Sequence, residues 1–262
     1  MSATPSEEKN VELLESLSKG LALLRLFATG VPSLTIQDVA ARLDVTRAAA
    51  RRLLLTLEHQ GYIRQDGRLF SVTPRVIELG YAYFASMNLP ALARPAMREL
   101  AATVQETCSL GVLDGEWVIM IAREEPQMPL RLDLAVGRRL PAYAHSLGRP
   151  LLAALDAQAW EEYVRRADFR KLSPYTVTSR SALEKSLRQV RAEGYSVVVD
   201  EIKDGIGGIS VPICDHAGAV VAAMTVSMVM GKRTREDVSR DYLPPLRKAV
   251  ASVEEVLHAL HR

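Results

Sequence analysis

The chain has 262 residues, room for one large domain or two smaller ones, and 48% of them are hydrophobic while 24% are charged, as in an ordinary folded protein. No apolar run approaches the ~20 residues that cross a bilayer, and the polar start lacks the parts of a secretion signal. Two distant cysteines, Cys108 and Cys214, exclude a disulfide framework and cannot form a metal site alone. We therefore expect a cytoplasmic protein without a membrane segment, metal or cofactor, in which residues 1–15 form a disordered tail.

The net charge of +2 is unevenly distributed along the chain. From Arg42 to Arg75 there are seven arginines against three acidic residues, which leaves this stretch with a charge of +4. Because this local excess is larger than the net charge of the whole chain, the positive charge is concentrated in one place.

Three helices are predicted in the first sixty residues. Apolar residues repeat at helical spacing in three successive segments, which begin at Ser16, Thr35 and Thr46. Thr35 is followed three residues later by Asp38, a variant capping box, and Gly61 is a natural end for the third helix. Two short amphipathic helices joined by a tight turn are typical of a helix-turn-helix.

The exposed side of the third helix indicates what the motif binds. At ~100° per residue, arginines and a small residue near the start of this helix point away from its apolar face. Arginines in such a place can pair with guanine edges or contact phosphates in the major groove, whereas the alternative is a solvated helix kept soluble by its arginines. The candidate DNA-contacting residues in the two helices are Thr35, Thr46, Arg47, Ala48, Arg51 and Arg52.

A basic hairpin is predicted directly after the third helix. The segment YIRQDGRLFSVT is typical of two short strands around Asp66-Gly67, a dipeptide favoured in tight turns. Arg64 and Arg68 flank this turn, as expected for the wing of a winged helix that contacts DNA. The alternative is a winged helix that binds only proteins and senses no ligand, but the concentrated arginines argue against it because their simplest use is phosphate contact. We predict a winged helix-turn-helix over residues 16–73.

A linker helix and a second domain complete the chain. Residues 74–89 form the predicted linker, because Thr73-Pro74 is a strong helix start and the segment is apolar on more than one face. Residues 90–262 alternate helices and strands, which predicts a mixed sheet with helices packed around it. Strands are expected at residues 108–113, 118–123, 130–136, 195–199, 209–213 and 220–226, and helices at residues 95–104, 146–155, 157–167, 181–192 and 236–260.

Two segments of the second domain are candidates for a ligand site. Ser146 is expected to cap a helix that contains Gly148, and a helix N-terminus offers free N–H groups to a carboxylate. The predicted loop from Asp200 to Ser210 contains a glycine-rich run whose backbone could approach a small molecule closely. The alternatives are a purely structural cap and an ordinary surface loop.

Several motifs resemble one family of regulators. The segments SLSKGLALLRLF, LDVTRAAARRLLLTLEHQGYI and FSVTPRVIELGYAYF resemble the DNA-binding half of IclR-type transcriptional regulators. TRAAARR and TPRVIELGYAY resemble their PcaR/PcaU/PobR branch, which controls protocatechuate, 4-hydroxybenzoate and β-ketoadipate catabolism. The likeness continues through GRRLPAYAHSLGRPLLAAL, YTVTS, VRAEGYSVVVDE, ISVPI and GAVVAAMTVS, so it covers nearly the whole chain.

The resemblance implies an α+β protein with an N-terminal winged helix-turn-helix, a linker helix and a C-terminal GAF-like α/β effector-binding domain over residues 90–262. It also implies a homodimer that can pair into a dimer of dimers, double-stranded promoter DNA as a partner, and a small aromatic or dicarboxylic acid that modulates the control of a catabolic operon. The effector-binding residues expected on this basis are Arg131, His145, Ser146, Leu147, Gly148, Glu201 and Ser210.

Two adjacent positions depart from the branch. Its members commonly carry arginine and serine where this chain has Gly207-Gly208. If that arginine holds an acidic effector, either Arg131 or Arg149 takes its place here, or this protein binds a different ligand.

An enzyme is the other main class of function, but the chain has no glycine-rich phosphate loop and no HExxH, CxxC or GxSxG motif, so no catalytic residue is predicted.

Overall fold

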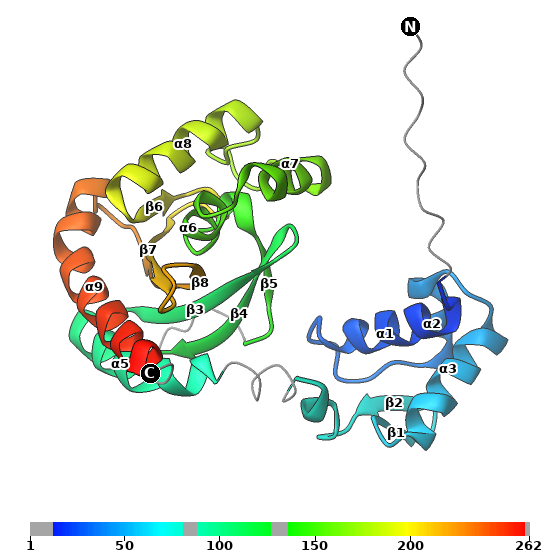
Figure 1. The fold of residues 1–262 in the computed structure, drawn as a ribbon. Coiled ribbons are helices and arrows are strands. Elements are labelled where there is room, and N and C mark those ends of the chain that lie inside the picture. The colour runs from blue at the N-terminus through cyan, green and yellow to red at the C-terminus, as the bar shows by residue number, and fades with distance from the viewer. Residues whose placement is uncertain (1–12, 81–87, 127–135, 260–262) are drawn as a thin grey trace, which may run out of the picture. The chain divides into compact units, whose positions relative to one another are not determined.

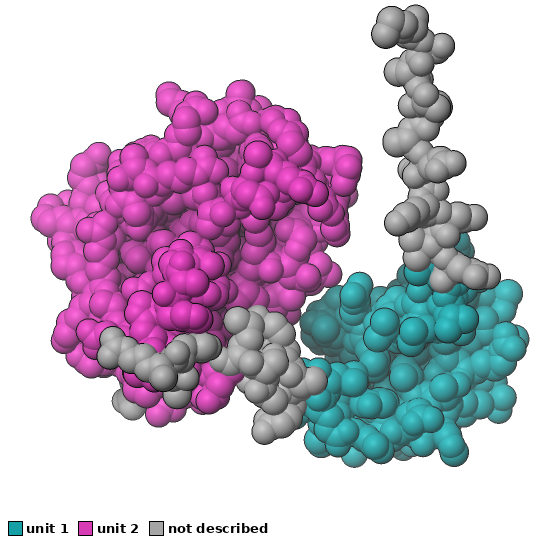
Figure 2. Space-filling model, in the orientation of Figure 1, with its two compact units in different colours: residues 1–87 teal, residues 88–262 magenta. Residues whose placement is uncertain are grey.

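The computed structural model describes residues 13–80, 88–126 and 136–259. The chain forms two compact units, residues 1–87 and residues 88–262, and each unit has its own hydrophobic core (Figure 2). Within the described ranges, none of the helices combines the length and the apolar character that crossing a membrane requires.

The first unit contains three helices followed by a two-stranded hairpin, as the sequence predicted (Figure 1). Its elements are α1 Glu15–Phe27, α2 Ile36–Leu43, α3 Arg47–His59, β1 Ile63–Asp66 and β2 Leu69–Val72. Their apolar faces meet in one core, which is made of Leu23, Phe27, Leu34, Val39, Ala50, Leu54, Ile63 and Phe70. This shared core fixes the hairpin and α3 relative to the other two helices.

Side-chain caps set where α2 and α3 begin, and both predicted caps are confirmed. Thr35 Oγ1 accepts a hydrogen bond from the Asp38 amide (3.1 Å), and the Asp38 carboxylate accepts one from the Thr35 amide (2.8 Å). Thr46 Oγ1 accepts from the Ala49 amide at 3.2 Å, directly before α3. Asp44 has a left-handed conformation (φ 51°) and makes the tight turn between the two helices.

The hairpin is the predicted one, but its turn lies one residue later. Asp66 pairs with Leu69, so the two-residue turn is Gly67-Arg68 rather than Asp66-Gly67. Gly67 has φ 58°, which glycine adopts without the strain that a side chain would cause. The Gln65 amide donates to Glu58 Oε1 (3.2 Å), and this bond ties the hairpin to α3.

The helix expected over residues 74–89 is described only in part. Residues 76–80 are helical, and residues 81–87 lie outside the described residues. Residue 89 belongs to the next helix, α5 Leu89–Val104, in the second unit.

The second unit is built on one six-stranded sheet in the order β5-β4-β3-β8-β7-β6. Its strands are β3 Thr107–Asp114, β4 Trp117–Glu124, β5 Arg139–Pro141, β6 Ser196–Val199, β7 Ile206–Cys214 and β8 Val220–Val229. Every neighbouring pair is antiparallel, so the prediction of a mixed sheet is wrong. The reason is that short connections join β3 to β4, β6 to β7 and β7 to β8, and a short turn can join only antiparallel strands.

Helices cover both faces of the sheet, and those predicted in this half are present (Figure 1). On one face α5 packs against α9 Arg235–Ala259. On the other face lies α6 Gly148–Ala153, which also contacts the short 3-10 helix η1 Ala142–Ala144 and α8 Arg180–Glu193. The remaining helix is α7 Ala157–Arg166. A core that includes Tyr143, Leu147, Leu152, Trp160, Tyr163, Leu183 and Leu187 fills this second layer.

Two predictions about the second unit need correction or lie out of reach. The strand expected over residues 130–136 falls largely on residues 127–135, which lie outside the described residues. The loop expected from Asp200 to Ser210 is shorter, because β7 begins at Ile206 and contains Gly207 and Gly208. Both glycines pair with β6 on one side and with β8 on the other. Hydrogen bonding to two neighbours therefore holds them extended, although glycine by itself disfavours strands.

Candidate functional site

The exposed side of α3 carries a row of arginines. Arg47, Arg51 and Arg52 are exposed, together with the small residue Ala48. Arg52 also lines a shallow groove beside α1, whereas Thr46 is exposed and its hydroxyl caps the helix. The leading half of α3 therefore presents positive charge and, at Ala48, a small side chain. Both suit a helix that enters the major groove.

The hairpin adds two more exposed arginines. Arg68 lies in the turn itself, and Arg64 lies on β1, where its Nε donates to Ser71 Oγ (3.3 Å). Thr35, which the sequence also suggested as a DNA contact, is half-buried, and its hydroxyl donates to the Asp38 carboxylate (2.7 Å) in the cap of α2.

Among the described residues, the charges of this surface have no counter-charges. Within the described part of the chain, no carboxylate pairs with the guanidinium groups on the leading half of α3 or on the hairpin. In the second unit, by contrast, carboxylates hold arginines such as Arg166, Arg180 and Arg240. A cluster of exposed guanidinium groups without carboxylate partners attracts a polyanion, and a nucleic-acid backbone is the polyanion that fits a helix with a basic hairpin.

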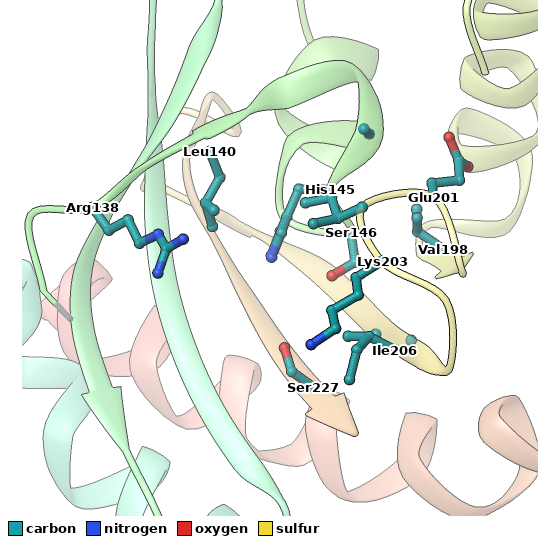
Figure 3. A pocket seen from close by; sticks show the side chains of 13 residues that line it. Arg138, Leu140, His145, Ser146, Val198, Glu201, Lys203, Ile206 and Ser227 are labelled. Carbon is teal, nitrogen blue, oxygen red and sulfur yellow. The ribbon is translucent and has the colours of Figure 1, made fainter. Parts of the chain in front are cut away.

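The second unit contains a cavity of about 360 Å³. It lies at one end of the sheet, between the start of β5, the segment that leads into α6 and the connection from β6 to β7 (Figure 3). The lining residues are Arg138, Leu140, Ala144, His145, Ser146, Val198, Glu201, Ile202, Lys203, Ile206, Gly207, Gly208 and Ser227. A cavity of this size, with apolar walls and a few polar groups, is typical of a small-molecule site.

Two cations reach the cavity from different walls. Arg138 comes from the residues just before β5, and Lys203 comes from the connection between β6 and β7 (Figure 3). No carboxylate in the described ranges pairs with the Lys203 ammonium group. Sequence reasoning missed both residues. Lys203 lies inside the predicted loop from Asp200 to Ser210, but it is not among the predicted effector residues. Arg138 gives no local signal, because only the path of β5 brings it to the cavity.

His145 presents a neutral imidazole to the cavity. Its Nδ1 accepts a hydrogen bond from the Leu147 amide (3.1 Å), so the proton of the neutral ring is on Nε2. Burial lowers the pKa of His145 to about 4, because the charged form loses its hydration. At neutral pH the residue is therefore a hydrogen-bond donor without a charge.

Ser146 does not cap α6, which corrects the sequence prediction. The helix begins at Gly148 with no side-chain cap, and Ser146 Oγ lies 2.9 Å from Thr225 Oγ1. Because the Thr225 hydroxyl donates to the Ile209 carbonyl (2.8 Å), Ser146 is the donor to Thr225. The side chain thus crosses to β8 and supports the cavity floor instead of satisfying a helix end.

Arg149 and Glu201 neutralise each other behind the cavity. The Arg149 Nη2 lies 2.8 and 2.7 Å from the two Glu201 carboxylate oxygens, and both residues are buried. Glu201 borders the cavity, but its carboxylate points away from the other lining side chains (Figure 3). Arg149 is therefore not the free arginine that an acidic ligand would need.

The remaining predicted effector residues lie away from the cavity or outside the described residues. Leu147 is buried in the core, and Ser210 Oγ donates to the Met224 carbonyl (2.9 Å). A Cβ on Gly148 would stand 2.0 Å from the Ala142 carbonyl oxygen, so this glycine serves close packing. Arg131 lies outside the described residues. Of the predicted set, the structure brings His145, Ser146 and Glu201 together at the cavity.

The two glycines of β7 form part of the cavity lining. A Cβ on Gly208 would lie 2.6 Å from Ser146 Oγ, and a Cβ on Gly207 would lie 2.4 Å from Met230 Sδ. Side chains at these positions, as in the branch that the sequence resembles, would therefore require Ser146 and Met230 to move. The positive charge of this cavity comes instead from Arg138 and Lys203.

Two family models match the chain. The IclR helix-turn-helix domain matches residues 16–67, and the C-terminal domain of bacterial transcriptional regulator IclR matches residues 81–255. The chain belongs to the IclR family. It is a DNA-binding transcriptional regulator with an effector-binding domain, and the prediction that it is not an enzyme is confirmed.

Two relatives confirm the branch of the IclR family. The regulator is 37% identical over 250 residues to the Pca regulon regulatory protein of Pseudomonas putida. The matched region covers 95% of this chain and 85% of that protein. It is 34% identical over 253 residues to the p-hydroxybenzoate hydroxylase transcriptional activator of Acinetobacter baylyi. The matched region covers 94% of this chain and 93% of that protein.

Solved structures of IclR-type regulators share the fold. A transcriptional regulator from Rhodococcus sp. RHA1 has a TM-score of 0.81 at 37% identity, covering 95% of this chain and 100% of that one. A double mutant of the PobR inducer-binding domain from Acinetobacter, solved with 3-hydroxybenzoic acid, has a TM-score of 0.60 at 29% identity, covering 64% of this chain and 98% of that one. The predicted α+β fold is confirmed.

The buried, neutral state of His145 predicts a pH dependence of stability. The folded protein keeps the ring neutral down to a pKa of about 4, whereas the unfolded chain protonates it below about 6.5. The contribution of His145 to the free energy of unfolding is therefore fully present above pH 6.5. It is lost as the pH drops toward 4, which lowers the free energy of unfolding by up to about 3 kcal/mol. Urea unfolding followed by tryptophan fluorescence measures it, because Trp117 and Trp160 both lie in the second unit.

The His145→Gln variant should show a weaker pH dependence than the wild type between pH 6.5 and 4. His59→Gln, which removes an exposed histidine from the first unit, controls for the loss of a histidine as such. An identical pH dependence in His145→Gln and the wild type would contradict the assignment.

Proposed function

We propose that this regulator binds promoter DNA through the arginines of α3 and the hairpin, and that a small organic acid in the cavity of the second unit changes this binding. One observation carries each half of the proposal. For DNA, it is the cluster of exposed arginines without carboxylate partners among the described residues. For the acid, it is the pair of cations, Arg138 and Lys203, at a cavity with apolar walls.

The geometry of α3 supports the proposed DNA contacts. Arg47, Ala48 and Arg51 lie in its leading half, where a recognition helix meets base edges, and the small Ala48 allows a close approach. Arg52, beside the groove to α1, is placed for a phosphate. Arg68 in the hairpin turn and Arg64 behind it suit the backbone or the minor groove. Thr46 and Thr35 lie at the two helix starts, where backbone amides also favour phosphates.

The acid would be held by charge at its carboxylate and by apolar contact along its body. Arg138 and Lys203 supply the charge, and Leu140, Val198 and Ile206 supply apolar walls. A dicarboxylate would pair with both cations. A hydroxybenzoate would pair with one cation through its carboxylate, and its hydroxyl would accept a hydrogen bond from His145. The names of the two relatives, which refer to the Pca regulon and to p-hydroxybenzoate hydroxylase, make both classes the first to test.

A second copy of the chain is the partner that the first unit fits. Leu14, Leu17 and Leu21 share one face of α1 and its N-terminus, with 72%, 60% and 49% of their surfaces exposed. We propose that this leucine face pairs two winged helices, so that a homodimer reads two half-sites. Ligand changes DNA affinity only as far as it prefers one arrangement of the dimer. A regulator of bacterial promoters works where the chromosome is, so we assign it to the cytoplasm.

Arg51→Ala should weaken binding to DNA upstream of its own gene by about 1–3 kcal/mol, the usual cost of a lost base contact. Arg68→Ala should weaken binding to all sequences alike and reduce the salt slope by about 1, because it removes a phosphate contact. Fluorescence anisotropy across a salt series measures both. Arg165→Ala, an exposed arginine of α7 in the second unit, is the matched control.

Unchanged affinity in both Arg51→Ala and Arg52→Ala would move the recognition surface elsewhere. If the wild type bound no upstream DNA, the alternative of a protein-interaction module would return.

Lys203→Met and Arg138→Met should test which acid binds. Calorimetry with β-ketoadipate, protocatechuate and 4-hydroxybenzoate first identifies the acid that the wild type prefers. A lost charge-assisted hydrogen bond costs about 1.5–3 kcal/mol, so affinity should fall about 10- to 150-fold. Both variants should weaken a dicarboxylate, and only one should weaken a hydroxybenzoate. Lys185→Met, an exposed lysine on α8, should bind like the wild type, and full affinity in both cavity variants would refute the site.

Leu17→Gln with Leu21→Gln should dissociate the homodimer, because polar side chains remove the apolar face that would be buried. Sedimentation velocity should show a monomer for this double variant and a dimer, or a dimer of dimers, for the wild type. Leu172→Gln, an exposed leucine of the second unit, is the control. A monomeric wild type, or a double variant that stays dimeric, would rule out this face as the interface.

A further inference from the structure

A buried ion pair joins the two walls of the cavity from behind. The Arg149 side chain is 3% exposed and that of Glu201 is 11% exposed. Arg149 follows His145 and Ser146 in the chain and begins α6 together with Gly148. Glu201 lies two residues before Lys203 in the connection from β6 to β7. The pair therefore links the wall that carries the neutral donor to the wall that carries the cation.

Each partner is also bound to a third element. Arg149 Nε donates to the Tyr143 carbonyl (2.7 Å), and its Nη1 donates to Ser186 Oγ on α8. Glu201 Oε2 accepts from the Val177 amide (3.1 Å). All three nitrogens of the guanidinium group are thus used, and a planar fork with three fixed partners holds its position more narrowly than a single ion pair would.

The connection that carries Lys203 is also held through its backbone. The Glu201 carbonyl accepts from Thr176 Oγ1 (2.6 Å), and the Asp200 carbonyl accepts from Ser173 Oγ. Asp200 has φ 63° and its Oδ1 accepts from the Gly205 amide (2.7 Å), which closes the turn. These bonds place Lys203 at the top of a turn whose base is fixed to Glu201.

A buried ion pair is a poor way to gain stability alone. Removing both charges from water costs about as much as their attraction returns, and well-packed apolar side chains in the same space are often as stable. What apolar side chains do not supply is direction, because packing contacts are not oriented in the way that hydrogen bonds are. The contribution of this pair therefore lies in the positions of the segments that it holds.

We propose that the Arg149–Glu201 pair is a positioning clamp, which sets how far Lys203 stands from His145 and thereby which acids the cavity accepts. The clamp rests on the proposed function of the cavity as the effector site. Neither residue touches the ligand in this role. Their charges cancel behind the wall, and their effect on the ligand is transmitted through the two segments that they hold.

The double variant Arg149→Met/Glu201→Leu separates positioning from stability. Each single replacement leaves an unpaired buried group and should lower the melting temperature, whereas the double replacement should restore much of it. The clamp predicts that the restored double variant still binds the preferred acid of the three at least about fivefold more weakly. It also predicts faster amide hydrogen exchange at residues 145–148 and 200–206 without any ligand. Lys248→Met/Glu99→Leu removes an exposed pair between α9 and α5 (3.1 Å) and is the matched control.

The outcomes distinguish the clamp from the cavity's function. If the double variant recovers both stability and acid affinity, with wild-type exchange at residues 200–206, the pair is only structural and the clamp is refuted. If the wild type binds none of the three acids, the proposed ligand class fails, and hydrogen exchange alone decides the clamp. If the double variant does not fold, Arg149→Lys replaces it, because it keeps the charge without the three-way fork. Wild-type affinity and exchange in Arg149→Lys would then refute the clamp.

Discussion

The guanidinium group of Arg149 is withdrawn from water and has to find its counter-charge inside the protein. Glu201 supplies it from a segment far away in the sequence, and the Tyr143 carbonyl and the Ser186 hydroxyl accept hydrogen bonds from the other two guanidinium nitrogens. Because a buried charge cannot be left unpaired, these contacts bring three separate parts of the second unit together. The cavity lies directly in front of this junction. Its walls are therefore held by the requirement for charge neutrality as much as by apolar packing.

Charge has the opposite distribution in the first unit. There the arginines of α3 and the hairpin extend into solvent, and no carboxylate in the described ranges pairs with them. The apolar core below fixes their backbone, and the bond from Gln65 to Glu58 fixes the hairpin against α3. The two units thus treat the same residue type differently. In the described part of the chain, the exposed arginines of α3 and the hairpin have no carboxylate partner, whereas Arg149 is paired and forms part of the frame.

The antiparallel sheet forms part of the cavity lining in the second unit. Gly207 and Gly208 lie extended between two strands, and their lack of side chains leaves room for Ser146 and Met230. The cations come from the walls instead of the floor, and the neutral His145 adds a donor without a competing charge. This arrangement suits the proposed ligand, a molecule with an apolar body and acidic ends, better than a neutral or cationic one.

Local patterns in the sequence are enough to predict the elements of the first unit and the family. Helical periodicity, two threonine caps and a glycine turn are local signals, because each depends on residues within a few positions of one another. The branch was identified from continuous motifs, which are likewise local. The hairpin turn lies one residue later than its local pattern predicts, because the register depends on which residues pair across the strands.

In the second unit, contacts between residues distant in sequence set the geometry of the candidate site. Gly207 and Gly208 have the composition of a loop, yet hydrogen bonds from β6 and β8 hold them in a strand. Ser146 has the pattern of a cap, yet its partner is Thr225 on β8. Arg149 and Glu201 both seemed suited to a ligand, and their pairing removes both from that role. In each case the deciding partner is distant in sequence, so no local pattern contains the information.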